Sequence, residues 1–283
     1  MSDRATTVVL DGLAFPEGPR WHDGRLFFSD QHDRRVIAVD AGGGAETIVE
    51  VPEQPSGLGW LPDGRMLVVS MLDRRVLRWD GDQLTEHADL SSLAPGECND
   101  MVVDRRGRAY VGNFGFDMYA GAEAQETCMI LVEPDGSARV AADGLAFPNG
   151  TVITDDGLTM IVGESYGGRL TAFSIADDGA LGARRLFARL QGAVPDGICL
   201  DSEGAVWVAC PITGRCLRIR DGGEVLDEVK VSNSFAFACM LGGHDRRTLY
   251  MCTAPSSDPK ETLSARGGRI ETLRVDVAGA GLP

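Results

Sequence analysis

The sequence predicts an all-β protein: a six-bladed β-propeller with four-stranded blades. Short apolar runs alternate with glycine-rich turns throughout the 283 residues, which include 36 glycines and 13 prolines. A motif in which a proline precedes an oxygen-bearing residue and a glycine follows it recurs along the chain. Corresponding positions lie 39 to 50 residues apart. Four short strands with their turns fit this interval, and radial repetition of such units gives a propeller.

The recurring motif opens each repeat. Its three clearest copies are Pro-Glu-Gly at 16–18, Pro-Asn-Gly at 148–150 and Pro-Asp-Gly at 195–197. The six opening positions, in chain order, are Glu17, Ser56, Asn99, Asn149, Asp196 and about Ala236. We expect each of them to start the innermost strand of its blade.

Short strand-like runs follow each opening in the order that a blade requires. In the first three repeats the predicted strands are 25–29, 35–40 and 45–50; 65–70, 75–80 and 84–88; and 109–113, 127–132 and 138–142. In the last three repeats they are 159–163, 169–175 and 184–188; 205–210, 216–220 and 224–229; and 248–253 and 268–275. The sixth repeat is therefore one strand short.

An additional strand-like run at 6–10 precedes the first repeat. We expect this N-terminal strand to complete the last blade and close the ring, which leaves no sheet edge open to aggregation. Six repeats around one shared core predict a single domain over residues 1–283.

Composition excludes several classes of function. A net charge of −15 argues against a nucleic-acid partner, because phosphate binding requires clustered Lys and Arg. The sequence contains no run of 18 apolar residues, so we expect no membrane-spanning helix. The N-terminus lacks the pattern of a signal peptide. The seven cysteines sit mostly in apolar runs and show no C-x-x-C spacing, so we expect buried, reduced thiols in a cytoplasmic protein. No obligate protein partner is evident.

The longest connection without strand character spans residues 114–126. It follows the second strand of the third repeat, so it should open at the same end of the propeller as the repeat-opening residues. Loops of this length often bind ligands, and we expect a lid or a wall of the substrate site. Its Phe114, Phe116 and Tyr119 indicate an apolar component in the substrate.

The opening residues predict a metal site at the mouth of the central channel. Glu17, Asn149 and Asp196 supply oxygen atoms from three repeats, and two of the three are carboxylates. Hard cations prefer such ligands, so we expect one divalent cation, with Ca²⁺ as the first choice and Mg²⁺, Mn²⁺ or Zn²⁺ as alternatives. The competing interpretation is that Asn, Asp and Gly simply form turns here.

Several of these motifs carry a family resemblance. The sequences Pro-Glu-Gly-Pro-Arg-Trp at 16–21, Cys-Asn-Asp at 98–100, Phe-Pro-Asn-Gly at 147–150 and Pro-Asp-Gly at 195–197 resemble those of the SMP-30/gluconolactonase/luciferin-regenerating-enzyme (LRE) family. The resemblance covers nearly the whole chain in the same order. It implies a six-bladed propeller with one divalent cation in the channel and, mostly, lactone hydrolysis.

Matching the family motifs assigns roles to individual residues. Glu17, Asn149 and Asp196 would be metal ligands, and Asn99 would contact the substrate or ligate the metal, as in the related diisopropyl fluorophosphatases. One departure concerns Glu97, because the similar sugar lactonases usually have arginine at this position. A glutamate does not suit an oxygen-rich anionic substrate, so a neutral or less hydroxylated lactone is favoured over gluconolactone. We also expect Glu97 and Asn113 to position the substrate.

These observations predict a lactonase-type carboxylic-ester hydrolase that acts on a small lactone. The cation would stabilise the developing oxyanion, and Asp196 would activate the attacking water as general base. Two alternatives stay open: a phosphotriesterase-like hydrolase in which Asp196 is base or nucleophile, and a calcium- or ligand-binding propeller without turnover. The G-x-S-x-G match at 163–167 precedes another strand pattern rather than a helix, which disfavours a serine hydrolase.

Overall fold

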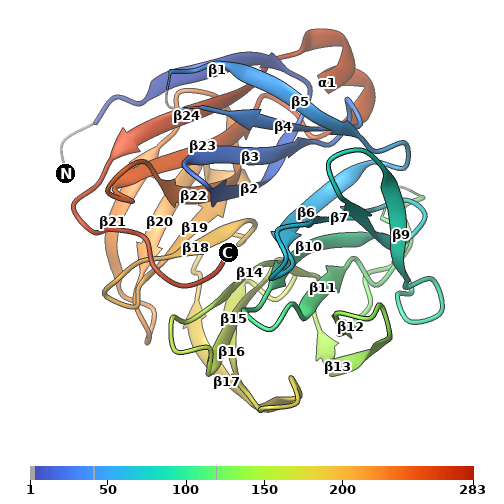
Figure 1. The fold of residues 1–283 in the computed structure, drawn as a ribbon. Coiled ribbons are helices and arrows are strands. Elements are labelled where there is room, and N and C mark those ends of the chain that lie inside the picture. The colour runs from blue at the N-terminus through green and yellow to red at the C-terminus, as the bar shows by residue number, and fades with distance from the viewer. Residues whose placement is uncertain (1–3, 41, 119) are drawn as a thin grey trace.

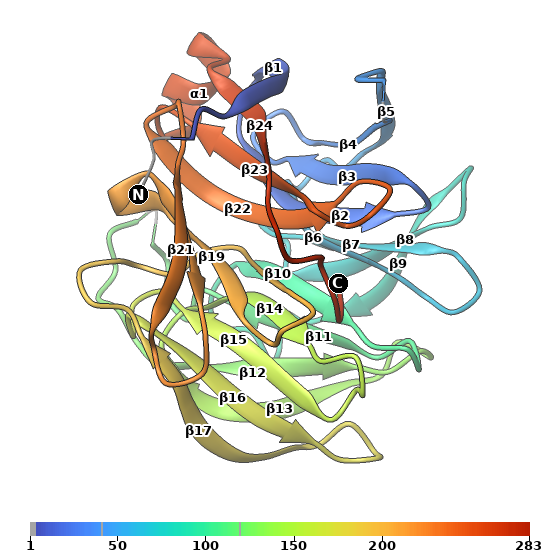
Figure 2. The same ribbon diagram turned by 90° about the vertical axis from the view of Figure 1, so that its left-hand side faces the viewer.

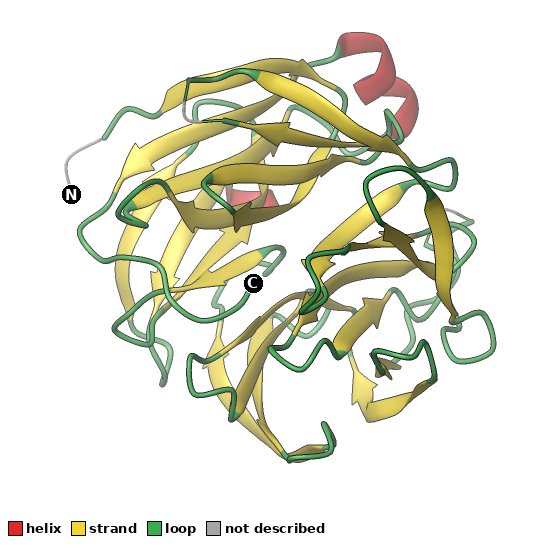
Figure 3. Cartoon of the chain, viewed as in Figure 1, coloured by secondary structure: helices red, strands yellow, loops and turns green. Residues whose placement is uncertain are grey.

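Six four-stranded antiparallel sheets surround a central axis in the computed structural model, which describes residues 4–40, 42–118 and 120–283 (Figure 1). A view turned by 90° shows the strands of the blades stacked around the same axis (Figure 2). Strands and loops make up most of the described chain, and helix is confined to two short segments (Figure 3). The prediction of a six-bladed β-propeller is confirmed.

The first three blades each consist of four consecutive strands, from the inner strand outward. Blade 1 contains β2 (Pro16–His22), β3 (Arg25–Asp30), β4 (Arg35–Val39) and β5 (Ala45–Glu50). Blade 2 contains β6 (Pro55–Trp60), β7 (Met66–Ser70), β8 (Arg75–Trp79) and β9 (Leu84–Asp89). Blade 3 contains β10 (Cys98–Val103), β11 (Ala109–Asn113), β12 (Thr127–Val132) and β13 (Ala138–Leu145).

The next two blades repeat this order, and the sixth differs. Blade 4 contains β14 (Pro148–Ile153), β15 (Thr159–Glu164), β16 (Arg169–Ile175) and β17 (Leu181–Arg189). Blade 5 contains β18 (Ile198–Leu200), β19 (Val206–Cys210), β20 (Arg215–Ile219) and β21 (Val225–Lys230). Blade 6 contains β22 (Phe235–Gly242), β23 (Thr248–Ala254), β24 (Gly268–Arg274) and β1 (Thr7–Leu13).

Strand β1 closes the ring. It pairs antiparallel with β24, with Thr7 opposite Thr272 and Leu13 opposite Gly268, so one blade is built from both ends of the described chain. The expected N-terminal strand is therefore confirmed as the outer strand of the last blade. The pairing covers the edge of β24 that the C-terminal repeat would otherwise leave open.

A glycine follows each oxygen-bearing opening residue except Asn99, and it allows neighbouring inner strands to approach closely around the axis. A Cβ atom on Gly57 would lie 2.3 Å from the Met101 backbone nitrogen of blade 3. On Gly150 it would lie 2.5 Å from the Ile198 nitrogen of blade 5. Both distances are shorter than real Cβ contacts. The Pro-X-Gly motif therefore serves the packing of the ring as well as the oxygen donors.

Apolar layers between adjacent blades form the core. One layer joins blades 1, 5 and 6 around Phe28, Trp207 and Met251, and another joins blades 2 and 3 around Leu67 and Met101. Because inner and middle strands are buried on both faces, their sequences read as nearly continuous apolar runs. All seven cysteines lie in or beside these layers as buried free thiols, as predicted.

The segment after β24 crosses the end of the propeller at which the inner strands finish. Leu282 and Ile153 exchange two backbone hydrogen bonds of 2.8 Å, and Gly279 forms a bridge with Asp201. In Figure 1 this segment runs inward to the centre of the ring. The opposite end, where the inner strands begin, carries the predicted oxygen donors.

Helix is limited to η1 (Pro211–Thr213) and α1 (Pro259–Ala265) among the described residues. Helix α1 begins where the Asp258 carboxylate accepts hydrogen bonds from the Lys260 and Glu261 backbone nitrogens, and Pro259 occupies the first turn. In the part of the chain that the structure describes, no helix is long and apolar enough to cross a membrane.

Candidate metal and substrate site

A cavity of about 220 Å³ opens where the inner strands begin. Four of the residues predicted from the sequence line it: Glu17, Asn99, Asn149 and Asp196. They come from blades 1, 3, 4 and 5, and 179 positions separate the first from the last along the chain. The propeller therefore brings the predicted donors to one cavity.

The position of each donor in its strand explains this convergence. Glu17, Asn99 and Asn149 are each the second residue of an inner strand, and the pairing register shifts directly after Glu17 and across the positions of Asn99 and Asn149. Such bulges redirect side chains, here at the mouth of the channel. Asp196 precedes β18 but extends its pairing, because its backbone nitrogen donates to the Ala209 carbonyl over 3.0 Å.

The carboxyl groups of Glu17 and Asp196 repel each other in a desolvated site. Burial, followed by the negative charge of Asp196, raises the pKa of Glu17 well above its usual value. Burial raises the pKa of Asp196 to about 8, and a hydrogen bond from the Asn149 side chain partly opposes this effect. Two buried acids with raised pKa values form a site that a cation would stabilise.

The positive charge of Arg20 acts on Glu17 and lowers its pKa, but the guanidinium group is hydrogen-bonded to other residues. Its Nη2 donates to Asp100 Oδ1 over 2.5 Å and to the Met101 carbonyl over 2.6 Å, while Nε donates to the Leu58 carbonyl over 2.9 Å. Arg20 therefore neutralises Asp100 and ties β2 to β6 and β10. A bound cation could therefore compensate the negative charge of the Glu17–Asp196 pair.

Ser165 positions Asn149. The Asn149 amide donates to Ser165 Oγ over 3.2 Å, and Ser165 Oγ donates to the Pro195 carbonyl over 2.7 Å, directly before Asp196. This short chain joins the donors of blades 4 and 5. The serine of the G-x-S-x-G match therefore supports the donor set, which the sequence alone did not reveal.

Asn99 is oriented by a second chain of hydrogen bonds. Ser56 Oγ donates to Asn99 Oδ1 over 3.4 Å and accepts from Gln31 Nε2 over 3.1 Å. Ser56 itself is 2% exposed and lies behind Asn99. The second repeat thus contributes a supporting group, and the Ala236 position of the sixth repeat contributes no side-chain oxygen.

The two other predicted substrate residues lie outside the lining of this cavity. Asn113 is fully buried; its amide donates to the Cys128 carbonyl over 2.9 Å, and its Oδ1 accepts from Thr127 Oγ1 over 2.6 Å. Asn113 therefore joins β11 to β12. Glu97 has one buried carboxylate oxygen, Oε2, without a hydrogen-bond partner in the described structure. Contact of either residue with substrate stays a prediction.

Aromatic side chains form much of the cavity wall. The ring of Phe114 stacks on that of Phe147 with centroids 4.4 Å apart, and Phe15 meets Phe237 edge to face at 4.6 Å. Met118 also lines the cavity, so the loop at 114–126 contributes to its wall as expected. Tyr119, named with this loop in the sequence prediction, lies outside the described residues.

His32 supports the Phe15 side of the cavity. Its ring stacks on Phe15 with centroids 4.6 Å apart, and Nδ1 lies 2.7 Å from Thr262 Oγ1 in helix α1. Burial lowers the pKa of His32 to about 4. The neutral ring therefore belongs to the folded state, while the unfolded chain takes up a proton near pH 6.5.

This difference predicts a pH-dependent stability. Because the unfolded state binds more protons between pH 4 and 6.5, the His32 contribution is lost as the pH falls through that window. We expect the wild type to lose roughly 2 kcal/mol more unfolding free energy than His32→Gln between pH 7 and pH 5. Urea unfolding of both proteins at the two pH values measures this. Equal losses would contradict a neutral buried His32.

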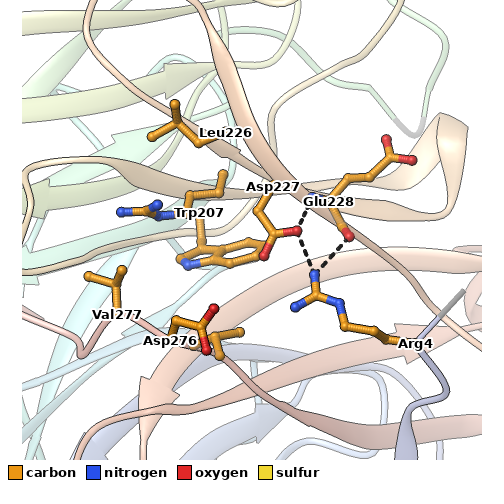
Figure 4. Close-up of a pocket in the computed structure, with 9 residues that line it drawn as sticks. Arg4, Trp207, Leu226, Asp227, Glu228, Asp276 and Val277 are labelled. Carbon is orange, nitrogen blue, oxygen red and sulfur yellow. Dashed lines mark hydrogen bonds and ion pairs between the residues drawn. The ribbon is translucent and has the colours of Figure 1, made fainter. Parts of the chain in front are cut away.

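A second cavity lies at the rim, between blades 5 and 6, and it draws on none of the predicted donors. Trp207 forms part of this cavity, and Arg4 reaches in from the N-terminal segment (Figure 4). Arg4 Nη2 contacts Asp227 Oδ1 at 2.5 Å and the Glu228 carbonyl at 3.2 Å. The N-terminal segment therefore joins blade 5 as well as blade 6.

The donor set at the channel mouth suits a hard cation. Among the described residues, no group of three or more His, Cys, Asp or Glu side chains could hold a metal ion. The predicted set therefore depends on amide oxygens beside its two carboxylates, as calcium sites commonly do. Fold and site together define a class: a six-bladed propeller with an oxygen-lined cavity at one end of its channel.

The chain belongs to the SMP-30/Gluconolactonase/LRE-like family, whose profile matches residues 15–255. A curated relative, 6-deoxy-6-sulfogluconolactonase of Pseudomonas putida, is 26% identical and aligns over 100% of this chain and 99% of its own. Pentonolactonase XacC of Haloferax volcanii is 27% identical over 98% of this chain and 96% of its own. The resemblance seen in the motifs is confirmed, and the family includes relatives named as lactone hydrolases.

Other relatives are named regucalcins. Regucalcin of Gallus gallus is 27% identical over 96% of this chain and 95% of its own. Among solved structures, a calcium-binding regucalcin from Agrobacterium tumefaciens superposes with a TM-score of 0.83 at 23% identity, covering 99% of this chain and 96% of that one. This structural likeness shows the shared propeller fold.

Proposed function

We propose that this protein is a divalent-cation-dependent lactonase that opens a small lactone by attack of water on the ring carbonyl. The observation that carries the proposal is the meeting of Glu17, Asn99, Asn149 and Asp196 in one cavity of a chain from this family. Full-length relatives named as lactonases support the reaction class.

Glu17, Asn149 and Asp196 would hold the cation, with Asn99 beside them. Their fit rests on the chemistry of the donors and on the raised pKa values of the two acids. Calcium is the first choice, and the relatives named regucalcin agree with it. A bound cation would supply Lewis-acid polarisation of the lactone carbonyl and charge stabilisation of its oxygen.

Asp196 would remove the proton from the attacking water. Its carboxyl group lines the cavity beside the other predicted donors, and a bound cation would keep it ionised and able to accept a proton. Asn99 would orient the substrate through its amide, held by Ser56. The rings of Phe114 and Phe147 would keep bulk water away from the reacting carbonyl.

A pH-stat assay with a panel of lactones tests this proposal. We expect acid release from at least one lactone, loss of that activity after chelation, and recovery when the cation returns. Cation binding should also stabilise the fold, by about 2.7 kcal/mol at a concentration one hundred times the Kd. A rise in the melting temperature with Ca²⁺ reports this without any substrate.

Other results would favour the alternatives. Lactone hydrolysis that survives chelation would contradict the cation requirement. Turnover of phosphotriesters without turnover of any lactone would point to the phosphotriesterase-like reading. Cation binding without turnover on either panel would indicate a binding protein. A cytoplasmic location is part of the proposal, and the seven free cysteines support it because cytosolic thiols are kept reduced.

A further inference from the structure

Building on the proposed lactonase function, we infer that the substrate carries an apolar alkyl or aryl substituent on its lactone ring. The inference depends on which side chains face the cavity apart from the oxygen donors. Such a substrate would differ from the sugar lactones that two relatives are named for, one of which is a sulfogluconolactone.

Apolar side chains enclose the cavity from several directions. Phe114 and Phe147 form one wall, and Phe15 and Phe237 form another; each of the four is at most 7% exposed. Met71, Met118 and Val194 complete this apolar surface. An alkyl chain or an aryl ring would lose its contact with water against such walls, which favours its binding.

The cavity lacks a group that would recognise an anionic substituent. No Arg, Lys or His is present among the described residues that line it, and Glu17 and Asp196 are both acids. A sulfonate, phosphate or carboxylate on the substrate would thus meet like charge at the donor set and apolar walls elsewhere. Recognition of such anions generally requires arginine or lysine.

Sugar hydroxyl groups would find few free partners. The Gln31 amide is bonded to Ser56, and Ser165 is bonded to both Asn149 and the Pro195 carbonyl. Each hydroxyl buried without a partner weakens binding, so a polyhydroxylated ring would bind poorly. Among the described residues of the lining, Ser257 is exposed and is the one hydroxyl outside these chains that a sugar could reach.

The backbone at Phe147 gives an independent indication. Phe147 has φ of +60°, in the left-handed region that bulky residues rarely adopt, directly before the Pro148-Asn149-Gly150 motif. A glycine would meet the backbone requirement without strain. Phe147 instead brings a ring into the cavity wall, where it stacks on Phe114 and lies 5.1 Å from the Tyr166 ring. Gln54 has φ of +69° at the matching place before Pro55, so the conformation belongs to the repeat, while the phenylalanine ring is particular to this wall.

Three δ-lactones that share one ring and differ in its substituents test the inference: unsubstituted δ-valerolactone, its 5-butyl derivative and D-glucono-1,5-lactone. We expect kcat/KM to rise about three- to fourfold for each methylene of the butyl chain that becomes buried. D-glucono-1,5-lactone should be the poorest of the three after correction for spontaneous hydrolysis. An equal or higher kcat/KM for D-glucono-1,5-lactone would overturn the inference and leave the proposed lactonase function intact.

Substitutions in the cavity wall test whether these side chains cause the preference for the butyl lactone. Phe147→Leu and Phe237→Leu should each reduce the preference for the butyl lactone over δ-valerolactone at least threefold. Phe187→Leu, which alters a buried phenylalanine of β17 outside the cavity, should leave that ratio unchanged. Unchanged ratios in both cavity variants, with melting temperatures near that of the wild type, would overturn the assignment of the walls.

A binding measurement keeps the inference testable if no lactone is hydrolysed. Calorimetry in the presence of Ca²⁺ would compare 5-hydroxynonanoate with gluconate, the ring-opened forms of the butyl lactone and the sugar lactone. Tighter binding of 5-hydroxynonanoate without turnover would support the apolar cavity while the proposed function fails. Tighter binding of gluconate would overturn the inference by itself.

Discussion

Replacing Asp196 by asparagine is expected to lower kcat/KM of the lactonase reaction by at least about 10³-fold. The variant keeps the shape of the side chain but removes the proposed base and one of the two carboxylates of the donor set. Saturating Ca²⁺ should not restore the rate, because the lost base is a separate function from cation binding. Steady-state kinetics on the best lactone measures the effect.

The same substitution should stabilise the cation-free protein. A carboxyl group whose pKa is raised in the folded state disfavours folding as the pH rises from about 4 to about 8, because the unfolded chain is ionised while the folded protein must protonate the group or bury its charge. Asparagine carries no such charge, and the melting temperature without Ca²⁺ should rise. Lost activity together with gained stability distinguishes a functional acid from a structural one.

A surface aspartate provides the matched control. Asp221 is about half exposed and pairs with Arg185 on the rim, so Asp221→Asn should alter neither activity nor Ca²⁺ binding. Retention of more than about a tenth of the wild-type rate in Asp196→Asn would contradict its role as general base. A rate loss fully reversed by high Ca²⁺ would assign Asp196 to cation binding only.

Replacing Gly57 by alanine is expected to lower the stability of the folded protein strongly. The added Cβ would lie 2.3 Å from the Met101 nitrogen and 2.8 Å from the Asp100 carbonyl carbon, both backbone atoms of β10. These atoms cannot move without separating blades 2 and 3. We expect a cost of about 3 kcal/mol or more. The melting temperature should then fall by roughly 6–12 °C.

Gly42→Ala is the control for this substitution. Its added Cβ would meet only a carboxylate oxygen of the exposed Asp40 side chain, at 3.2 Å, and no backbone atom of another blade. Differential scanning calorimetry of the two variants compares the same chemical change at the axis and at the surface. A melting temperature of Gly57→Ala within about 2 °C of the wild type would mean that the inner strands are less closely packed than described here.

The repeat pattern in the sequence was sufficient to predict the fold. Strands with glycine-rich turns recur at a regular interval, and apart from the pairing of β1 with β24 each blade pairs strands that follow one another in the chain. Predicted boundaries such as 45–50 and 127–132 coincide with β5 and β12. The helix at Pro259–Ala265 was not predicted, although Asp258 followed by Pro259 is a common start signal for a helix.

The predicted donors could be placed together for the same reason. Glu17, Asn99 and Asn149 hold the same position in the first, third and fourth repeats, so a repeat alignment places them at one end of the channel even without coordinates. Asn113 and Glu97 show the limit of that reasoning. Each lies near a strand end in the third repeat, but the side chain of Asn113 faces its own blade and Glu97 is outside the cavity lining.

The sequence by itself therefore determined the propeller, its closure by the N-terminal strand and the oxygen donors at the channel mouth, because all three follow from a repeated pattern. Only the tertiary structure decided what surrounds those donors. Phe15, Phe147 and Phe237 meet at the cavity, and Ser165 joins Asn149 to the Pro195 carbonyl, through contacts between different blades. Such contacts depend on how closely the blades pack and on the direction in which each bulge turns its side chain. The spacing of the repeats in the sequence predicts neither of these.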